Sequence, residues 1–244
     1  MRRVALAVTA IALLSPFVRA AEPGKFGYGP DNGPANWAKL EAGFAECGSG
    51  TRQSPIDIDP RNAIKAELPP LQLNYGVGKL TTLDPTDNTT IDRGGGNFVT
   101  LGGKRFILEG LHFHHPSEHS IGGQSFPLEA HLVHKSADAQ IAVIGVLIKS
   151  GKADPGIAAL PDASHPKHVS MLASALIPQD RTYWTYNGSL TTPPCTEGVR
   201  WIVMRNPIEM SPEQIQALTD SLDAIWHGPN ARPVQHANGR FVLR

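Results

Sequence analysis

Histidines alternate with apolar residues in two stretches of the sequence, residues 111–114 and 128–134, and this alternation constrains the fold more than any other feature. Side chains two residues apart on a β-strand point to the same face of the sheet, so His112 and His114 project together. His131 lies on an equivalent face of the second stretch. If the two stretches pair as neighbouring strands, three imidazoles converge on one side of a β-sheet.

Three neutral imidazoles with one open coordination position form the ligand set of a catalytic zinc ion. A lone His-x-His motif more often marks only the polar face of a half-buried strand. Here Glu129 precedes His131 by two residues, where its carboxylate can accept the second ring N–H of a ligand. The two motifs together therefore predict a zinc site made by His112, His114 and His131.

A different zinc motif also occurs, because residues 115–119 read His-x-x-Glu-His, as in inverted zinc proteases. That motif needs a helix to bring both histidines to one face. Pro116 disfavours the helical conformation at His115, and Gly122 and Gly123 follow closely. We therefore reject a protease site.

The sequence resembles the α-class carbonic anhydrases, of the exported bacterial type, over nearly its whole length after residue 20. The resemblance rests on Trp37 and on short motifs at residues 27–29, 32–34, 53–58, 111–114, 117–119, 129–134, 189–194, 232–233 and 238–240. It implies an α+β, β-dominated fold, in which a large, twisted, mostly antiparallel β-sheet carries short peripheral helices in one domain, residues 21–244. It also implies a lyase activity: zinc-dependent, reversible hydration of carbon dioxide to bicarbonate and a proton through a zinc-bound hydroxide.

The resemblance implies roles for further residues. The hydroxyl of Thr191 would accept a hydrogen bond from the hydroxide and donate one to Glu118, whose ionised form such a bond favours. Tyr28 and Thr192 would order the water chain. Carbon dioxide is apolar and needs an apolar wall beside the zinc. The positions that match this substrate pocket are Val133, Val143, Leu190, Thr192 and Trp201.

Two positions depart from the family pattern. Gly110 stands two residues before His112, where a Gln usually holds the ring of the first ligand. The hydrogen bond to that ring must come from water or backbone, or be absent. The motif that usually supplies a proton-shuttling His corresponds to residues 84–88, which include Asp87 and Asn88 but no His. The proton shuttle is therefore left unassigned.

The N-terminus has the pattern of a cleaved secretory signal peptide, residues 1–20. Arg2 and Arg3 precede an apolar run at residues 4–14, and Ala20 ends the cleavage site. This run is too short to span a bilayer, and no later stretch is long enough. We therefore expect a periplasmic or secreted protein with no membrane span after cleavage; an uncleaved anchor is the alternative.

Cys47 and Cys195 are the two cysteines, and in an exported chain they are expected to form a disulfide. The sequence has 22 basic and 22 acidic residues, and loss of the three arginines of residues 1–20 leaves a net charge of about −3. The sequence has no stripe of basic residues of the kind that marks a nucleic acid partner. We therefore predict a small-molecule partner, CO2 or bicarbonate, and leave the oligomeric state open.

Turn and capping residues place the main elements. Gly102 and Gly103 predict a hairpin turn, and residues 211–214 predict an N-cap with a capping box for an amphipathic helix that ends before Gly228. A shorter amphipathic helix is expected near residues 168–176. Strands are expected at residues 71–75, 98–101, 104–108, 141–148 and 201–204.

Two other functions compete with the enzyme. A carbonic-anhydrase-like binding or surface protein with weak turnover is the main alternative, and loss of a zinc histidine usually marks such a member. An esterase side activity of the same zinc site is the second. All three histidines are present here, which favours the enzyme.

Overall fold

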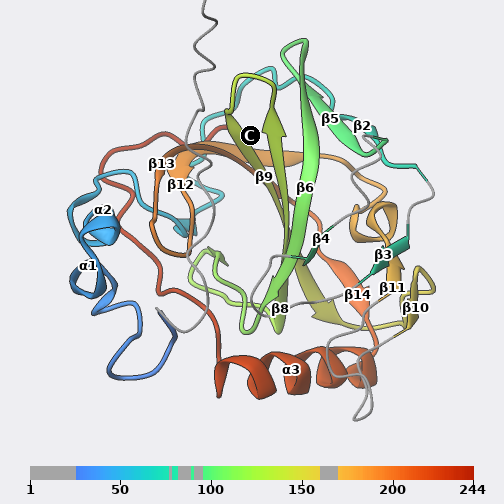
Figure 1. The fold of residues 1–244 in the computed structure, drawn as a ribbon. Coiled ribbons are helices and arrows are strands. Elements are labelled where there is room, and N and C mark those ends of the chain that lie inside the picture. The colour runs from blue at the N-terminus through green and yellow to red at the C-terminus, as the bar shows by residue number, and fades with distance from the viewer. Residues whose placement is uncertain (1–25, 77–78, 82–88, 91–95, 160–169) are drawn as a thin grey trace, which may run out of the picture.

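One large, curved β-sheet with short helices at its periphery forms the centre of the single domain (Figure 1). The computed structural model describes residues 26–76, 79–81, 89–90, 96–159 and 170–244. The predicted signal peptide, residues 1–20, and the shuttle segment, residues 84–88, lie outside the described residues. The elements in chain order are α1 (Trp37–Leu40), η1 (Ala42–Phe44), α2 (Glu46–Ser49), β1 (Asp57–Ile58), β2 (Gln72–Asn74), β3 (Lys79–Thr81), β4 (Thr89–Thr90), β5 (Phe98–Leu101), β6 (Lys104–His114), β7 (Ser120–Ile121), β8 (Leu128–Ser136), β9 (Ile141–Ser150), β10 (Ile157–Ala159), β11 (Ser170–Leu172), η2 (Ala173–Leu176), β12 (Tyr183–Ser189), β13 (Glu197–Met204), β14 (Ile208–Met210) and α3 (Pro212–Trp226).

The central sheet comprises nine strands in the described part of the chain. Its main path is β12-β13-β9-β8-β6-β5-β2, while β14 pairs with β9 and β4 with β6. Along that path the only parallel neighbours are β9 and β13, and β14 also runs parallel to β9. The predicted large, mostly antiparallel sheet is therefore confirmed, with a parallel element at β9 that the resemblance did not specify.

Local sequence explains the hairpin and the long helix. Gly102 and Gly103 join β5 to β6 with φ of 57° and 79°, the positive values that a two-residue turn of this kind requires. At α3 the side chain of Ser211 accepts from the backbone N–H of Gln214, which completes the predicted capping box. The helix ends at Trp226, and the C-cap residue His227 adopts the left-handed conformation with φ of 61°.

The predicted short helix near residues 168–176 is wrong. Residues 170–172 form β11, and only residues 173–176 form a helical turn, η2. The reason is tertiary pairing, because β11 joins β10 and β3 in a separate three-stranded sheet. Sheet hydrogen bonds to distant segments outweigh a weak helical pattern.

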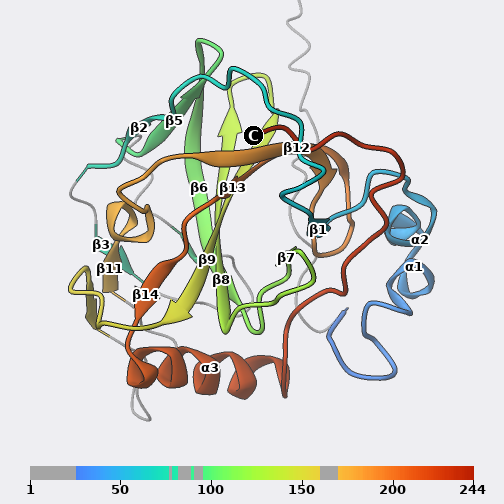
Figure 2. The same ribbon diagram turned by 180° about the vertical axis from the view of Figure 1, so that it is seen from behind.

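The two faces of the sheet pack against different parts of the chain. Alternation along the strands sends Leu132 and Ile144 into one core, which α3 closes with Leu218 and Leu222. Figures 1 and 2 show α3 lying across one end of the long strands. The opposite face belongs to a second core, around Trp201, and carries the histidines.

Two further expectations concern export. Cys47 of α2 and Cys195, in the loop before β13, form a disulfide across 148 residues of sequence. Within the ranges that the structure describes, no helix is both long and apolar enough to cross a membrane.

Candidate metal centre

Three histidines from two neighbouring strands meet on the second face of the sheet. His112 and His114 lie on β6, and His131 lies on β8 directly opposite His112. Nδ1 of His131 is 3.3 Å from Nε2 of His112, and the three ring centroids are 4.5 to 5.1 Å apart. One nitrogen from each ring lies within 4.8 Å of the others. The predicted strand pairing thus brings three nitrogens around one point.

Burial keeps these imidazoles neutral. It lowers the pKa of His112 well below the usual value, that of His114 to about 4, and that of His131 as well. Neutral rings are the form that binds metals. Nε2 of His114 is buried and has no hydrogen-bond partner in the described part of the chain. Such an atom needs a partner, and the donor set fits a zinc ion.

Glu129 holds the ring of His131 from behind. Its Oε1 lies 3.0 Å from Nε2 of His131 and 2.7 Å from Nδ1 of His119. Its Oε2 accepts from the backbone N–H groups of Glu118 and His119, at 2.9 and 2.8 Å. Burial raises the pKa of Glu129, but attraction to His119 and His131 outweighs it and holds the pKa well below the usual value. The carboxylate therefore fixes which nitrogen of His131 faces the other two histidines.

The chain of contacts continues beyond Glu129 through residues to which the sequence reasoning gave no role. Nε2 of His119 is 2.7 Å from the hydroxyl of Tyr186, which is 2.9 Å from Oγ of Ser54. The hydroxyl of Tyr186 donates to Ser54, so the contacts run from Glu129 through His119 and Tyr186 to Ser54. His119 and Ser54 belong to the motifs of residues 117–119 and 53–58, which are signals of their importance. Tyr186 lies outside the motifs that carry the resemblance and gave no signal.

Glu118 lies beside the histidines in a different electrostatic setting. Its Oε1 accepts from the backbone N–H of Arg232 at 2.8 Å, and its Oε2 lies 3.4 Å from Nε2 of His114. Burial raises the pKa of Glu118 to about 7, although His131, Thr191 and Arg232 act to lower it. The hydrogen bond from Thr191 thus favours the ionised form of Glu118, and burial opposes it. A cation at the three histidines would also favour the ionised form.

The other two histidines differ in how their rings are held. Nδ1 of His114 donates to the backbone carbonyl of Asn230 at 2.8 Å. The side chain of Asn230 also donates to the carbonyl of Phe113 at 2.9 Å, which fixes this loop against β6. In contrast, Nδ1 of His112 is buried without a partner among the described residues. With Gly110 at the position of the usual Gln, the hydrogen bond to the His112 ring was expected from water or backbone. The described backbone does not supply it.

The proposed substrate wall lies next to His131. Val133 is paired across the strands with Val143, and Val143 with Trp201. The ring of Trp201 is 4.9 Å from that of His131 between centroids, and its Nε1 donates to the carbonyl of Ser189 at 2.9 Å. Leu190 and Val133 pack against the same cluster. The four apolar positions therefore lie together beside one histidine.

The two residues proposed to order water differ in what the structure shows. Tyr28 packs edge to face on Trp37 and Trp226. Its pKa is raised well above the usual value by burial and then by the charge of Glu118, so its hydroxyl is close to the site. Thr192 follows Thr191 and accepts from the backbone N–H of Cys195 through its carbonyl, at 2.9 Å.

Residues 115–119 do not form a helix, in agreement with the rejection of a protease site. Nε2 of His115 contacts Asp223 of α3 at 2.7 Å, whereas His119 faces Glu129. The two histidines of that motif thus do not meet.

Comparison with known proteins agrees with this site. The eukaryotic-type carbonic anhydrase family matches residues 32–244. A carbonic anhydrase of Pectobacterium carotovorum is 37% identical over 225 residues, covering 89% of this chain and 90% of that protein. Dioscorin dioA3 of Dioscorea japonica is 36% identical, covering 88% and 83%. The α-carbonic anhydrase of Thermovibrio ammonificans, solved with the inhibitor sulfanilamide, superposes with a TM-score of 0.79 at 38% identity, covering 90% of this chain and 98% of that one.

A mixed, mostly antiparallel sheet with three clustered histidines on one face, two of them buried and His112 partly buried, defines a candidate metalloenzyme. With the matches above, the chain belongs to the eukaryotic-type, or α-class, carbonic anhydrase family, and it is an enzyme of that family, whose general reaction is the hydration of carbon dioxide.

Proposed function

We propose that His112, His114 and His131 hold one zinc ion and that this site hydrates carbon dioxide reversibly to bicarbonate. The convergence of three neutral imidazole nitrogens on one face of the sheet carries the proposal. Zinc held by three histidines supplies a nucleophile at neutral pH, because it lowers the pKa of water from 15.7 to about 7.

The surrounding residues orient the reacting groups. Glu129 and the carbonyl of Asn230 accept from the outer nitrogens of His131 and His114, so both rings present their remaining nitrogen to the cation. Thr191, buried beside Glu118, donates its hydroxyl proton to the carboxylate. Its oxygen is then free to accept a hydrogen bond from the attacking water, which directs a lone pair at the substrate carbon.

Carbon dioxide needs no hydrogen bond to be recognised. Val133, Val143, Leu190 and Trp201 form an apolar surface beside His131 where it can lie without displacing ordered polar contacts. Tyr28 and Thr192 order water on the polar side of the site. The residue that exports the proton stays unassigned.

We also propose that residues 1–20 are removed on export and that the mature enzyme works in the periplasm or outside the cell. The disulfide between Cys47 and Cys195 supports this, because disulfides persist in oxidising compartments. Mass spectrometry of the exported protein should give a chain that starts at Ala21. A full-length chain that begins at Met1 would contradict cleavage.

A stopped-flow CO2 hydration assay tests the activity. Turnover should be rapid and should disappear with a zinc chelator, and His131→Ala should lose zinc and at least about a hundredfold of the rate. His236→Ala, at an exposed position, is the matched control and should behave as wild type. Slow turnover in the zinc-loaded protein would favour the alternative, a zinc-binding surface protein; the dioscorin relative shows that not every relative carries the enzyme's name.

A further inference from the structure

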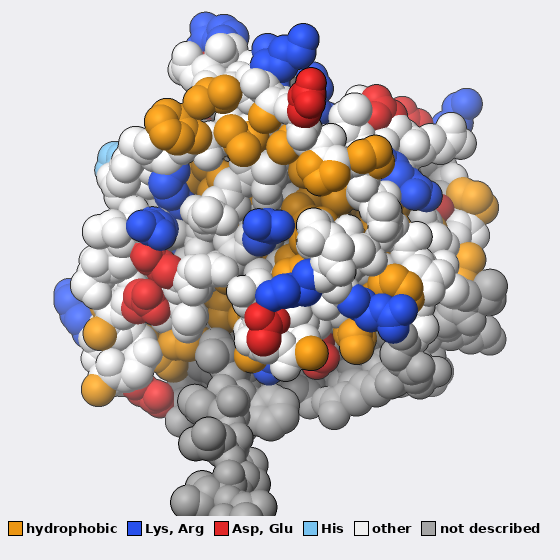
Figure 3. All heavy atoms as spheres, turned by 90° about the horizontal axis from the view of Figure 1, so that it is seen from above, with side chains coloured by type: hydrophobic (Ala, Val, Ile, Leu, Met, Phe, Trp, Pro, Cys, Tyr) orange, Lys and Arg blue, Asp and Glu red, His pale blue; other side chains and the backbone are white. Residues whose placement is uncertain are grey.

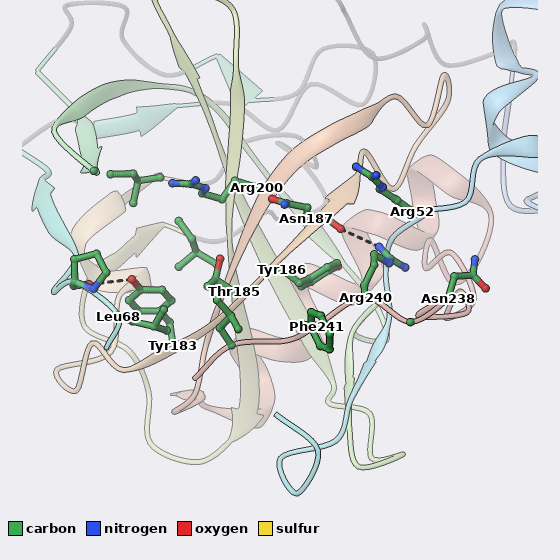
Figure 4. Close-up of a pocket in the computed structure, with 16 residues that line it drawn as sticks. Arg52, Leu68, Tyr183, Thr185, Tyr186, Asn187, Arg200, Asn238, Arg240 and Phe241 are labelled. Atoms are coloured by element: carbon green, nitrogen blue, oxygen red, sulfur yellow. Dashed lines mark hydrogen bonds between the residues drawn. The ribbon is translucent and has the colours of Figure 1, made fainter. Parts of the chain in front are cut away.

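A cavity of about 730 Å³ is lined by none of the three histidines, nor by Glu118, Glu129 or Thr191. Its lining comes from β12, β13, the β5–β6 turn and the C-terminal segment (Figure 4). On β12 and β13, Thr185 pairs with Ile202 and Asn187 with Arg200, while Tyr186, between them, pairs with Trp201. Since Trp201 is on the histidine face, the alternate residues Asn187 and Arg200 point to the other side of the sheet. Tyr186 also lines the cavity, which therefore runs along β12, the end strand of the main path of the sheet, and is lined by none of the three histidines.

Positive charge dominates this cavity. Arg52, Arg200 and Arg240 line it, and no Asp or Glu is among its lining residues. In the part of the chain that the structure describes, the exposed side chain of Arg200 has no hydrogen bond or ion pair. Glu197 lies nearby, where it accepts from the backbone N–H of Arg52 at 2.6 Å, and offsets part of the charge. At least one guanidinium is thus left available for an anion.

Arg240 is held rigidly by neutral groups. Its guanidinium donates to the backbone carbonyls of Asn187, Gln53 and His236, at 3.1, 2.7 and 2.9 Å, and lies over the ring of Tyr186 at 5.5 Å. Carbonyls satisfy its N–H groups without cancelling its charge. Figure 4 shows Arg240 beside Asn187, with Phe241 below it. This is a fixed positive wall rather than a mobile surface side chain.

The floor of the cavity is apolar. Phe241 is 72% exposed, the largest exposed fraction among the big apolar side chains of the described chain. Leu101, Ile202 and Leu243 line the cavity around it. Figure 3 looks onto this end of the molecule and shows hydrophobic side chains between Lys and Arg side chains. Exposed apolar surface bordered by charge indicates a binding site, and the volume is within the range of small-molecule pockets.

We propose that this cavity binds a small organic anion with an apolar body, of the class of aromatic monocarboxylates and monosulfonates. The anionic group pairs with Arg200, whose planar guanidinium suits two-point contact with carboxylate or sulfonate oxygens. The apolar body covers Phe241. Charge complementarity and the size of the cavity carry this inference, and it does not depend on zinc or on CO2 hydration.

Fluorescence titration with anilinonaphthalene sulfonate tests the proposal in the whole protein. We expect saturable binding to one site, about tenfold or more weaker after Arg200→Gln and after Phe241→Ala. Arg200→Lys should bind more tightly than Arg200→Gln but less tightly than wild type, because it keeps the charge and loses the two-point contact. The uncharged analogue phenylnaphthylamine should bind about tenfold or more weakly than the sulfonate. Lys39→Gln, at an exposed position of α1, removes a charge elsewhere and should have no effect.

Three control measurements distinguish binding in this cavity from loss of folding and from binding at the zinc site. Thermal melting shows that each variant is folded. The dye should bind His131→Ala as it binds wild type, and Arg200→Gln should keep wild-type CO2 hydration, so a failure here is distinct from a failure of the zinc assignment. Absent binding, equal affinity in Arg200→Gln and wild type, loss of binding in His131→Ala, or a Phe241-dependent dimer in sedimentation that excludes the dye would each overturn the proposal.

Discussion

Replacing Gly110 with Gln should slow the release of zinc. Nδ1 of His112 is a buried atom with no described partner, and position 110 lies two residues earlier on β6, next to it on the same face. An amide oxygen there can accept from this nitrogen. A hydrogen bond to an otherwise unpaired buried donor is worth roughly 1–3 kcal/mol, which corresponds to about 5-fold to 140-fold in a dissociation constant.

The assay is the rate of zinc transfer from Gly110→Gln and wild type to an excess of chromogenic chelator. Gly110→Met is the matched control, since its side chain has similar length and no comparable acceptor. Gln should release zinc about tenfold more slowly than both Met and Gly. Equal release from Gln and Met, with melting temperatures that show both variants to be folded, would refute the idea that the ring of His112 lacks a partner.

Three further predictions concern pH, the disulfide and proton export. Burial lowers the pKa of His134 to about 4, so the folded state takes up a proton less readily than the unfolded one and stability should fall by about 3 kcal/mol as pH falls from about 6.5 to about 4. His134→Gln should flatten that slope in urea unfolding at several pH values; an unchanged slope would contradict it. Serine at both Cys47 and Cys195 should lower the free energy of unfolding by up to about 5 kcal/mol, because the bridge closes a long loop. A loss below about 1 kcal/mol in the same assay would show that the loop entropy does not matter. Since residues 84–88 contain no His, kcat should rise with added imidazole buffer while kcat/KM stays constant. A high kcat that does not depend on buffer concentration would show that another residue transfers the proton.

The strand period explains why the candidate site could be predicted. Alternation places His112 and His114 on one face whatever the rest of the chain does, and Glu129 follows from the same rule on β8. Contacts between distant segments of the chain could not be predicted in this way. Asn230 contacts His114 from beyond α3, and Ser54 contacts Tyr186 across 132 residues of sequence. No local sequence pattern predicts these two contacts.

Two other features were not predicted from the sequence, and each has a physical cause. The segment of residues 170–172 became β11 because a distant strand pairs with it, which no periodicity encodes. The sequence indicates that a hydrogen bond favours the ionised form of Glu118, but it does not predict how strongly burial opposes that form. Its burial, visible only in the fold, raises the pKa to about 7.

The central claim is that three histidines bind one zinc ion and that this ion is required for CO2 hydration. The most direct measurement is the hydration rate of metal-free protein as zinc is added in known amounts. The rate should rise linearly and stop rising at about one zinc per chain, as one three-histidine site requires. A rate that does not depend on zinc, or that breaks at about two per chain, would contradict the account.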